Sequence, residues 1–183
     1  MKFFALAASH RTGSLNRLLV SQVADMVRAA GHTVVQEDYA ALDMPLYNDE
    51  QSSENHIHNT PNIFADRADA VDGLLVASPE YNWSYPGTLK NIIDWTSRRA
   101  PCPLAGKTVL LLSATPSGRG GINGLVHLRT PFESLQAVVF PRVFPLGHAD
   151  RMLAEGTLQD ERQHHILTHI VKDYLEFTRK LRS

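Results

Sequence analysis

The chain has 183 residues, a formal net charge of -1 at pH 7, and 43% hydrophobic and 20% charged residues. This length and composition are typical of one soluble globular domain with a sizeable core. The near-zero net charge gives no electrostatic reason to expect a nucleic acid as partner. The single cysteine, Cys102, excludes an intrachain disulfide and a cysteine-built metal site.

The chain is expected to be cytoplasmic and not membrane-bound. No apolar run approaches the ~18 residues of a membrane span. The N-terminal run from Phe3 to Ala8 is shorter than the ~7–15 residues of a signal-peptide core. A lone cysteine also fits a reducing compartment.

Strand and helix patterns alternate along the chain, without internal repeats or a linker-like break in composition. Strands are predicted over 2–8, 32–38, 72–78, 107–114 and 137–140, and helices over 14–30, 62–70, 86–99, 121–135 and 158–181. The nearly continuous apolar strands are typical of a parallel sheet that is buried on both faces. The pattern predicts a single three-layer α/β domain over residues 1–183. Ligands bind such sheets at the carboxyl ends of the strands, so the loops after strands one, three and four are expected to meet there.

The loop after the first strand has the composition of an anion site. Ser9, Thr12, Ser14 and Asn16 supply short polar side chains directly before a helix, and Arg11 adds a planar cation suited to phosphate. Two other interpretations stay open: Ser14 as a simple helix cap with a solvated arginine, and a dinucleotide fingerprint. The loop has one glycine where the G-x-G-x-x-G fingerprint has three, which favours a single phosphate monoester.

The loop after the third strand combines rigidity with flat chemistry. Pro79 and Pro86 stiffen it, and Tyr81, Asn82 and Trp83 offer aromatic or amide surfaces. Such a loop suits a flavin ring, which needs a stacking surface and fixed hydrogen-bond donors as negative charge develops on reduction.

Both loops carry motifs of a known family. Ser9-x-Arg11-x-x-Ser14-x-Asn16 and the segment P-E-Y-N-x-S-x-P-G-x-L-K-N-x-I-D-W over 79–95 resemble the NAD(P)H-dependent FMN reductases, a flavodoxin-like group that includes quinone, azo-dye and chromate reductases. The resemblance covers roughly residues 2 to 175 and departs from the family at Ala8 and His10. It implies a flavodoxin-like three-layer sandwich whose five-stranded parallel sheet has the order 2-1-3-4-5.

The resemblance also implies which residues bind FMN. Those for the phosphate are Ser9, Arg11, Ser14 and Asn16, with the backbone of Leu15. Those for the isoalloxazine are Pro79, Glu80, Tyr81 and Asn82. From the loop after the fourth strand come Ser113 and Gly118, although the glycines there are also compatible with a flexible turn.

The family chemistry is hydride transfer from NADPH or NADH through FMN to a small acceptor, with ping-pong kinetics. A quinone is the expected acceptor, and free flavin, azo or nitro compounds are plausible ones. The cofactor carries this chemistry, so no side chain is assigned as catalytic. Glu80 is expected to turn away and bond backbone or a partner subunit rather than act as a base.

Three further expectations concern partners and other sites. Ile92 and Trp95 lie on a second apolar stripe of the helix over 86–99, which suggests a subunit contact; the alternative is that a neighbouring helix of the same chain covers them. The resemblance implies a homodimer or homotetramer. His165 and His169 have the i, i+4 spacing of metal ligands but read as a solvated face, so no metal is expected; His56 and His58 read likewise, with a substrate-facing role left open.

Two alternatives to an enzyme remain. A flavodoxin-like electron carrier is usually strongly acidic, which the net charge of -1 argues against. A relative that has lost FMN is disfavoured by the intact Arg11, Asn16 and P-E-Y-N residues.

Overall fold

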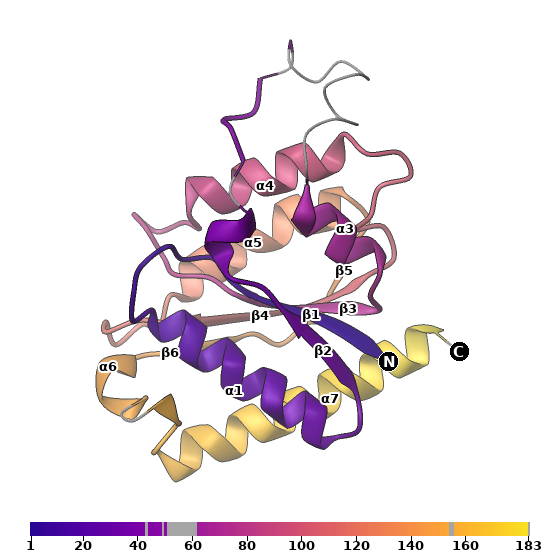
Figure 1. The fold of residues 1–183 in the computed structure, drawn as a ribbon. Coiled ribbons are helices and arrows are strands. Elements are labelled where there is room, and N and C mark those ends of the chain that lie inside the picture. The colour runs from indigo at the N-terminus through magenta and orange to yellow at the C-terminus, as the bar shows by residue number, and fades with distance from the viewer. Residues whose placement is uncertain (43, 49, 51–61, 154–155, 183) are drawn as a thin grey trace.

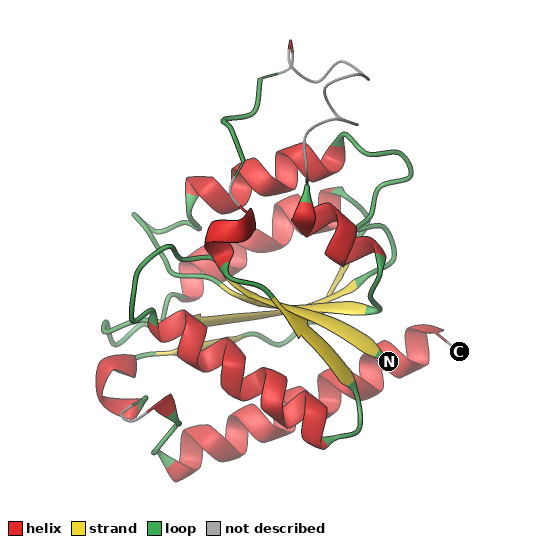
Figure 2. Ribbon diagram, viewed as in Figure 1, coloured by secondary structure: helices red, strands yellow, loops and turns green. Residues whose placement is uncertain are grey.

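The computed structural model describes residues 1–42, 44–48, 50, 62–153 and 156–182. Helices cover both faces of a central parallel sheet (Figures 1 and 2). Helices α1 (Leu15–Ala29) and α7 (Glu161–Arg182) lie below the sheet in Figure 1, and α3 (Ile63–Asp69), α4 (Gly87–Ser97) and α5 (Ile122–Ser134) lie above it. This is the three-layer α/β architecture that the alternating pattern predicts.

The sheet has the predicted strand order, β2-β1-β3-β4-β5, and every strand pair is parallel. Its strands are β1 (Lys2–Ala7), β2 (Thr33–Gln36), β3 (Gly73–Ala77), β4 (Thr108–Ala114), β5 (Val138–Val139) and β6 (Phe144–Leu146). β1 alternates between the two cores, because Phe3 packs on the α1/α7 side and Phe4 on the opposite side. Both are fully buried, which explains the continuous apolar pattern of this strand.

The prediction of one fifth strand is wrong in detail. β5 pairs with Thr108 and Val109, whereas β6 continues the same edge further along, opposite Leu112 to Ala114. Pro141 has no amide hydrogen to donate, which helps to explain the break after Phe140. β6 contains Pro145, a residue that argues against a strand in a sequence pattern but is tolerated at a sheet edge.

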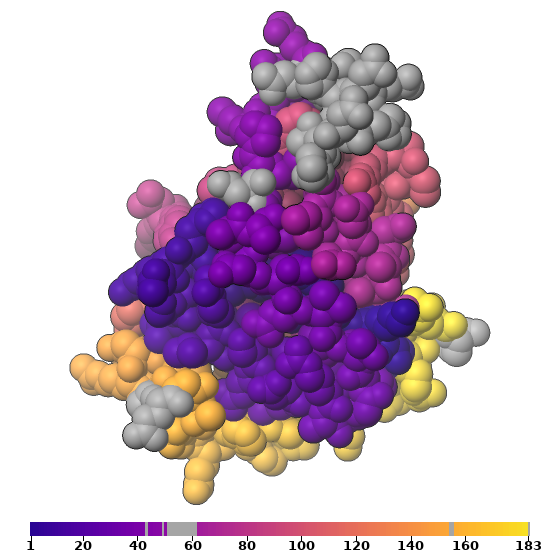
Figure 3. All heavy atoms as spheres, in the orientation of Figure 1, coloured from indigo at the N-terminus to yellow at the C-terminus, as the bar shows by residue number. Residues whose placement is uncertain are grey.

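Two short elements were also absent from the prediction. They are a 3-10 helix over Tyr39–Leu42, within the stretch expected to be irregular, and helix α6 (Ala149–Met152). In the space-filling view, the N-terminal part of the chain covers most of the visible face, and the yellow C-terminal helix follows the lower edge (Figure 3). Among the described residues, no helix combines the length and the apolar character that a bilayer crossing requires.

The subunit contact expected from Ile92 and Trp95 is wrong, because both side chains are buried within the protein. Ile92 is 1% exposed and Trp95 is 3% exposed. The indole Nε1 of Trp95 donates to the carbonyl of Pro45 at 2.8 Å, and its ring meets Tyr47 edge-on at 5.3 Å. An apolar stripe identifies which helix positions are covered, but it does not reveal that Ile92 belongs to the internal core or that the segment after β2 folds back over Trp95.

Asn91 completes this attachment of the segment over 44–48 to α4. Its Oδ1 accepts from the Tyr47 amide at 2.7 Å, and its Nδ2 donates to the carbonyls of Met44 and Pro45 at 3.1 and 3.0 Å. The two motif residues Asn91 and Trp95 therefore serve to fix the loop that follows β2.

Candidate cofactor and substrate site

Three loops meet at the carboxyl edge of the sheet, on the side away from the chain ends in Figure 1. The Ala8 amide, just past β1, donates to Ala77 of β3 at 2.8 Å, and the Ser78 amide donates to Leu112 of β4 at 2.9 Å. These bonds hold the starts of the loops over 8–14, 78–86 and 115–121 beside one another, as predicted.

The loop after β1 forms an anion cradle, by which we mean residues 9–16. Ser14 caps α1, where its Oγ accepts from the Arg17 amide, so the capping interpretation is confirmed. Capping does not exclude an anion, because the amides of Leu15 and Asn16 have no acceptor within the helix. The first turn of α1 carries no acidic residue, and the exposed Arg11 supplies a positive charge. This donor set fits a phosphate group.

Asn16 is only 4% exposed and connects the start of α1 to the end of β4. Its Nδ2 donates to the Ala114 carbonyl at 3.0 Å, and its Oδ1 accepts from the Ala114 amide at 2.9 Å. The amide side chain therefore clamps the first turn of α1 to the last residue of β4. One Nδ2 hydrogen remains for a ligand.

The loop after β3 contains a two-residue hairpin turn. Tyr81 and Ser84 exchange backbone hydrogen bonds of 2.8 and 3.0 Å, and Asn82 and Trp83 between them have φ values of 49° and 68°. Positive φ at both central residues is the type I′ geometry. The turn leaves the rings of Tyr81 and Trp83 exposed at 55% and 57%, so it presents flat apolar surface to solvent at the carboxyl edge of the sheet.

The Glu80 side chain turns away to bond backbone, as expected. Its Oε2 accepts from the Gly124 amide at 2.8 Å, in the first turn of α5. A β-carbon on Gly124 would lie 3.3 Å from Cβ of Glu80, so the two segments are in close contact. A carboxylate is favourable at a helix N-terminus, and it fixes the loop after β3 against the helix that follows β4.

The loop after β4 is not a flexible turn, because its glycines allow backbone to touch backbone. A β-carbon on Gly120 would lie 2.6 Å from the carbonyl carbon of Pro145, and one on Gly147 would lie 2.6 Å from the oxygen of Gly118. The His148 amide donates to Ser117 and the Ala149 amide to Thr115, at 3.2 and 3.0 Å. The loop is therefore packed onto the segment after β6.

Of the two residues predicted here, Gly118 is exposed and Ser113 is fully buried. Ser113 Oγ points at Gly121, whose β-carbon, if present, would lie 2.3 Å away. Within the described part of the chain, this oxygen is the one buried side-chain polar atom without a protein partner. Ser113 thus lies beneath the N-terminus of α5 rather than at the open rim.

The family model described as NADPH-dependent FMN reductase matches residues 1–151. The chain belongs to this family. It is accordingly an oxidoreductase that uses FMN and NAD(P)H, and the carrier alternative is not favoured.

Individual relatives agree with the family assignment. The quinone reductase of Escherichia coli (strain K12) is 34% identical over 139 residues, which are 76% of this chain and 73% of the relative. An NAD(P)H-dependent FMN reductase of Pseudomonas aeruginosa is 30% identical over 193 residues, covering 100% of this chain and 98% of the relative.

Solved structures support the flavodoxin-like fold. FerB, a flavoenzyme NAD(P)H:(acceptor) oxidoreductase from Paracoccus denitrificans, superimposes with a TM-score of 0.81 at 24% identity, over 98% of this chain and 97% of FerB. Oxidised flavodoxin 2 from Bacillus cereus gives a TM-score of 0.65 at 15% identity, with coverages of 96% and 99%. The predicted fold class is confirmed.

The geometry adds residues that the sequence alone did not assign to the site. The Arg119 guanidinium lies 4.6 Å from the centre of the Trp83 ring, which joins the loops after β3 and β4 at their rim. Trp83 was recognised as a flat surface, but its pairing with Arg119 had no signal in the sequence. His148, with φ of 50°, stands beside Gly118 and was also missed.

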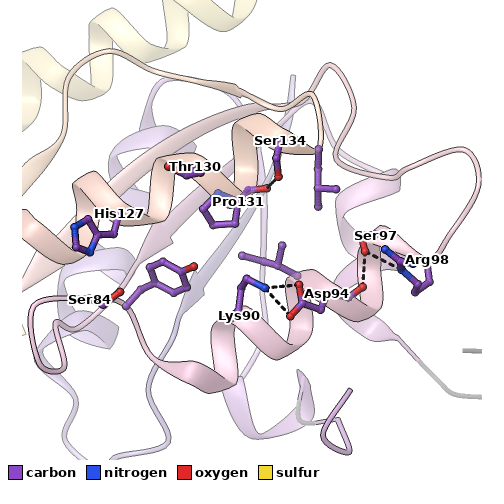
Figure 4. A pocket seen from close by; sticks show the side chains of 12 residues that line it. Ser84, Lys90, Asp94, Ser97, Arg98, His127, Thr130, Pro131 and Ser134 are labelled. Carbon is purple, nitrogen blue, oxygen red and sulfur yellow. Dashed lines mark hydrogen bonds and ion pairs between the residues drawn. The ribbon is translucent and has the colours of Figure 1, made fainter. Parts of the chain in front are cut away.

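A groove of about 720 Å³ begins where the hairpin ends and runs between α4 and α5 (Figure 4). On the α4 side Lys90 pairs with Asp94 at 2.7 Å, and His127, Thr130 and Ser134 line the α5 side. It lies on the helix face of the molecule and is separate from the anion cradle.

The histidines remain without a metal-binding arrangement in the region that the structure covers. The rings of His165 and His169 meet edge-on with centroids 4.3 Å apart. No group of three or more potential ligand side chains was found among the described residues. His56 and His58 lie outside the described residues.

Proposed function

We propose that FMN binds across the carboxyl edge, with its phosphate in the anion cradle and its ring against the loop after β3. The phosphate ligands are Ser9, Arg11 and Ser14 with the Leu15 amide, while Asn16 holds the cradle and offers its remaining Nδ2 hydrogen. The observation that carries this proposal is the cradle itself, which combines free helix amides, hydroxyls and a guanidinium without an acidic residue in the first turn.

The ring contacts involve the backbone and planar side chains of Pro79, Glu80, Tyr81 and Asn82. The Glu80 carboxylate is engaged with Gly124, so its part is to hold this loop in place rather than to accept a proton. Gly118 borders the ring from the loop after β4, and Ser113 supports that loop from below. When bound, FMN supplies hydride exchange between the reduced nicotinamide and the acceptor.

A quinone is the proposed acceptor, because relatives in several organisms are named quinone reductases. Free flavin, azo and nitro compounds are further candidates for the same site. The protein's part is to fix the cofactor between two rigid loops and to leave room above it for one planar substrate at a time, which requires ping-pong kinetics.

The proposal is tested by the visible absorption of the purified protein, recorded before and after NADPH or NADH is added without air. We expect a flavin spectrum that bleaches with the nucleotide and returns when a quinone is added. Bound flavin that neither nucleotide reduces would indicate a carrier. A protein that neither contains nor takes up FMN would contradict the assignment of both loops.

We also propose a single FMN-binding domain over residues 1–183, a cytoplasmic location, and a homodimer or homotetramer. The oligomer is supported by the α4/α5 groove and by Val126, a hydrophobic residue of α5 that is 52% exposed. Substitution Val126→Glu should shift the sedimentation coefficient towards that of a monomer, whereas Val126→Ala should not. A monomeric wild-type protein would contradict this part of the proposal.

A further inference from the structure

Trp83 occupies a backbone position that does not suit it. Its φ of 68° lies in the left-handed region, where the backbone of residues other than glycine, asparagine and aspartate is strained. An Asn-Gly pair is the favoured sequence for such a turn, and Asn82 already provides the first half. A bulky residue that is both strained and 57% exposed gains little from burial. Strain of this kind is characteristic of functional sites.

Arg119 forms a cation–π contact with the Trp83 ring. Its guanidinium stacks over Trp83 at 4.6 Å, between Gly118 and Gly120 in the loop after β4. None of the ion pairs found among the described residues involves Arg119, so its charge is not neutralised by a carboxylate there. A guanidinium that stacks on an aromatic ring keeps its N–H groups in plane and available to an anion.

The two residues connect the loops after β3 and β4, and a 2.8 Å bond between Glu80 and Gly124 also attaches the loop after β3 to the start of α5. We propose that Trp83 and Arg119 form a binding element for a planar co-substrate that carries a negative charge. The ring of the co-substrate stacks on Trp83, and its anionic group pairs with Arg119. This inference rests on the proposed function and adds to it a preference for acidic co-substrates.

An anionic group can come from either of two sources. One is the extra phosphate that distinguishes NADPH from NADH, and the other is an acidic substituent on the electron acceptor. Both would use the same guanidinium, so the experiment has one arm for each. The acceptor arm compares lawsone, a hydroxynaphthoquinone that is an anion at neutral pH, with menadione, its uncharged methyl analogue.

The variants are Arg119→Gln and Trp83→Gly, with Arg162→Gln as the control. Arg162 is exposed at the start of α7, so the control makes the same change in net charge on a different element of the fold. We expect Arg119→Gln to lower the lawsone-to-menadione ratio of kcat/KM, or the NADPH-to-NADH ratio, by up to about fivefold, the upper end for one exposed charge pair. The arm that responds identifies the source of the anion. Ratios in both arms that match those of Arg162→Gln would overturn the inference.

A second readout does not depend on turnover. Lawsone should quench the fluorescence of exposed Trp83 in the oxidised protein without nucleotide, and Trp83→Gly should remove that saturable component, because the remaining Trp95 is buried. Trp83→Gly should also keep or raise the melting temperature, since glycine relieves the turn. A lower melting temperature, or quenching that persists, would mean that Trp83 has a structural role only.

These outcomes separate the inference from the proposed function. A wild-type protein that takes up no FMN would contradict the proposed function, and lawsone quenching in the apoprotein would still test the Trp83–Arg119 element. A wild-type flavoenzyme with unchanged ratios and unchanged quenching in the variants would contradict the inference alone.

Discussion

The two edges of the sheet differ in how their polar groups are satisfied. At the amino edge, Tyr174 of α7 is fully buried, and its hydroxyl bonds to Thr108 Oγ1 and to the Leu74 carbonyl, both at 3.1 Å. Thr178 Oγ1 bonds to Thr108 Oγ1 at 2.8 Å. At the carboxyl edge lie the left-handed residues Asn82 and Trp83, the exposed rings of Tyr81 and Trp83, and the free amides at the start of α1.

The difference shows how one sheet can combine a fully bonded core at one edge with groups that are available to a ligand at the other. The polar groups at the amino edge have no water to replace a lost partner, so they must bond to one another. At the carboxyl edge, Arg11, Tyr81 and Trp83 are exposed, and a ligand can take over the contacts that water makes with them. Stability and ligand binding should therefore respond to different substitutions, and this separation can be tested.

The largest effect is expected from Asn16→Ala, because Asn16 belongs to the functional edge and yet makes two buried bonds. Its loss leaves the amide and carbonyl of Ala114 without partners, and the free energy of unfolding should fall by about 2–4 kcal/mol. Urea denaturation of the apoprotein measures this. Removal of the α1 cap by Ser14→Ala should cost only about 1 kcal/mol. Equal losses in the two variants would contradict the clamp.

Arg11→Gln should weaken FMN binding and leave the apoprotein's unfolding unchanged. Bonds from a charged donor are worth about 1.5–3 kcal/mol, which corresponds to a roughly 10- to 100-fold higher Kd. Fluorescence titration with FMN provides the measurement, and Arg162→Gln is the charge-matched control. If the two variants bound FMN equally well, Arg11 would not be a phosphate ligand.

Tyr174→Phe should lower the stability of the protein and leave FMN binding unchanged, which is the reverse of the result expected for Arg11→Gln. The free energy of unfolding should fall by about 1–3 kcal/mol, because the variant loses the hydroxyl and leaves its buried partners less satisfied. The Kd for FMN should stay the same, since the residue lies at the other edge. A changed Kd with unchanged stability would refute the division between the edges.

The same residue predicts a dependence on alkaline pH. Burial raises the pKa of Tyr174 above its usual value of 10.0. The unfolded chain therefore loses this proton first, so the contribution to stability is constant below about pH 10 and declines above it. Urea denaturation at about pH 9 and pH 11 should show a fall in the wild type that is smaller in Tyr174→Phe. Parallel declines in the two proteins would assign the effect to other groups.

The smallest effect is expected for Glu80→Gln. Glutamine keeps an oxygen acceptor for the Gly124 amide but removes the negative charge at the start of α5. The free energy of unfolding should therefore fall by about 0.3–1 kcal/mol. The pH profile of the reductive half-reaction, followed by stopped-flow absorbance, should not change. Loss of an ionisation from that profile would show that Glu80 takes part in proton transfer.

Much of the site could be predicted from local patterns. The strand-to-helix transition at Ser14 identifies the cap, and the prolines around Tyr81 and Asn82 indicate a rigid loop. The orientation of Glu80 was also predicted correctly. The clamp between Asn16 and Ala114 was not found, because its two ends are 98 residues apart and a buried amide has no distinctive sequence signal. Trp95 was misassigned for the same reason, since its cover comes from the distant Pro45 and Tyr47.

The sequence by itself determined the parallel α/β class and the position of the loops that we propose to bind the cofactor, since hydrophobic periodicity and turn chemistry are local properties. The tertiary structure alone decided which distant groups meet. The division of the last sheet edge into β5 and β6, the burial of Trp95 and the stacking of Arg119 on Trp83 all depend on how the chain packs. Such contacts arise from the shared burial of segments that are far apart in sequence, and no local pattern records them.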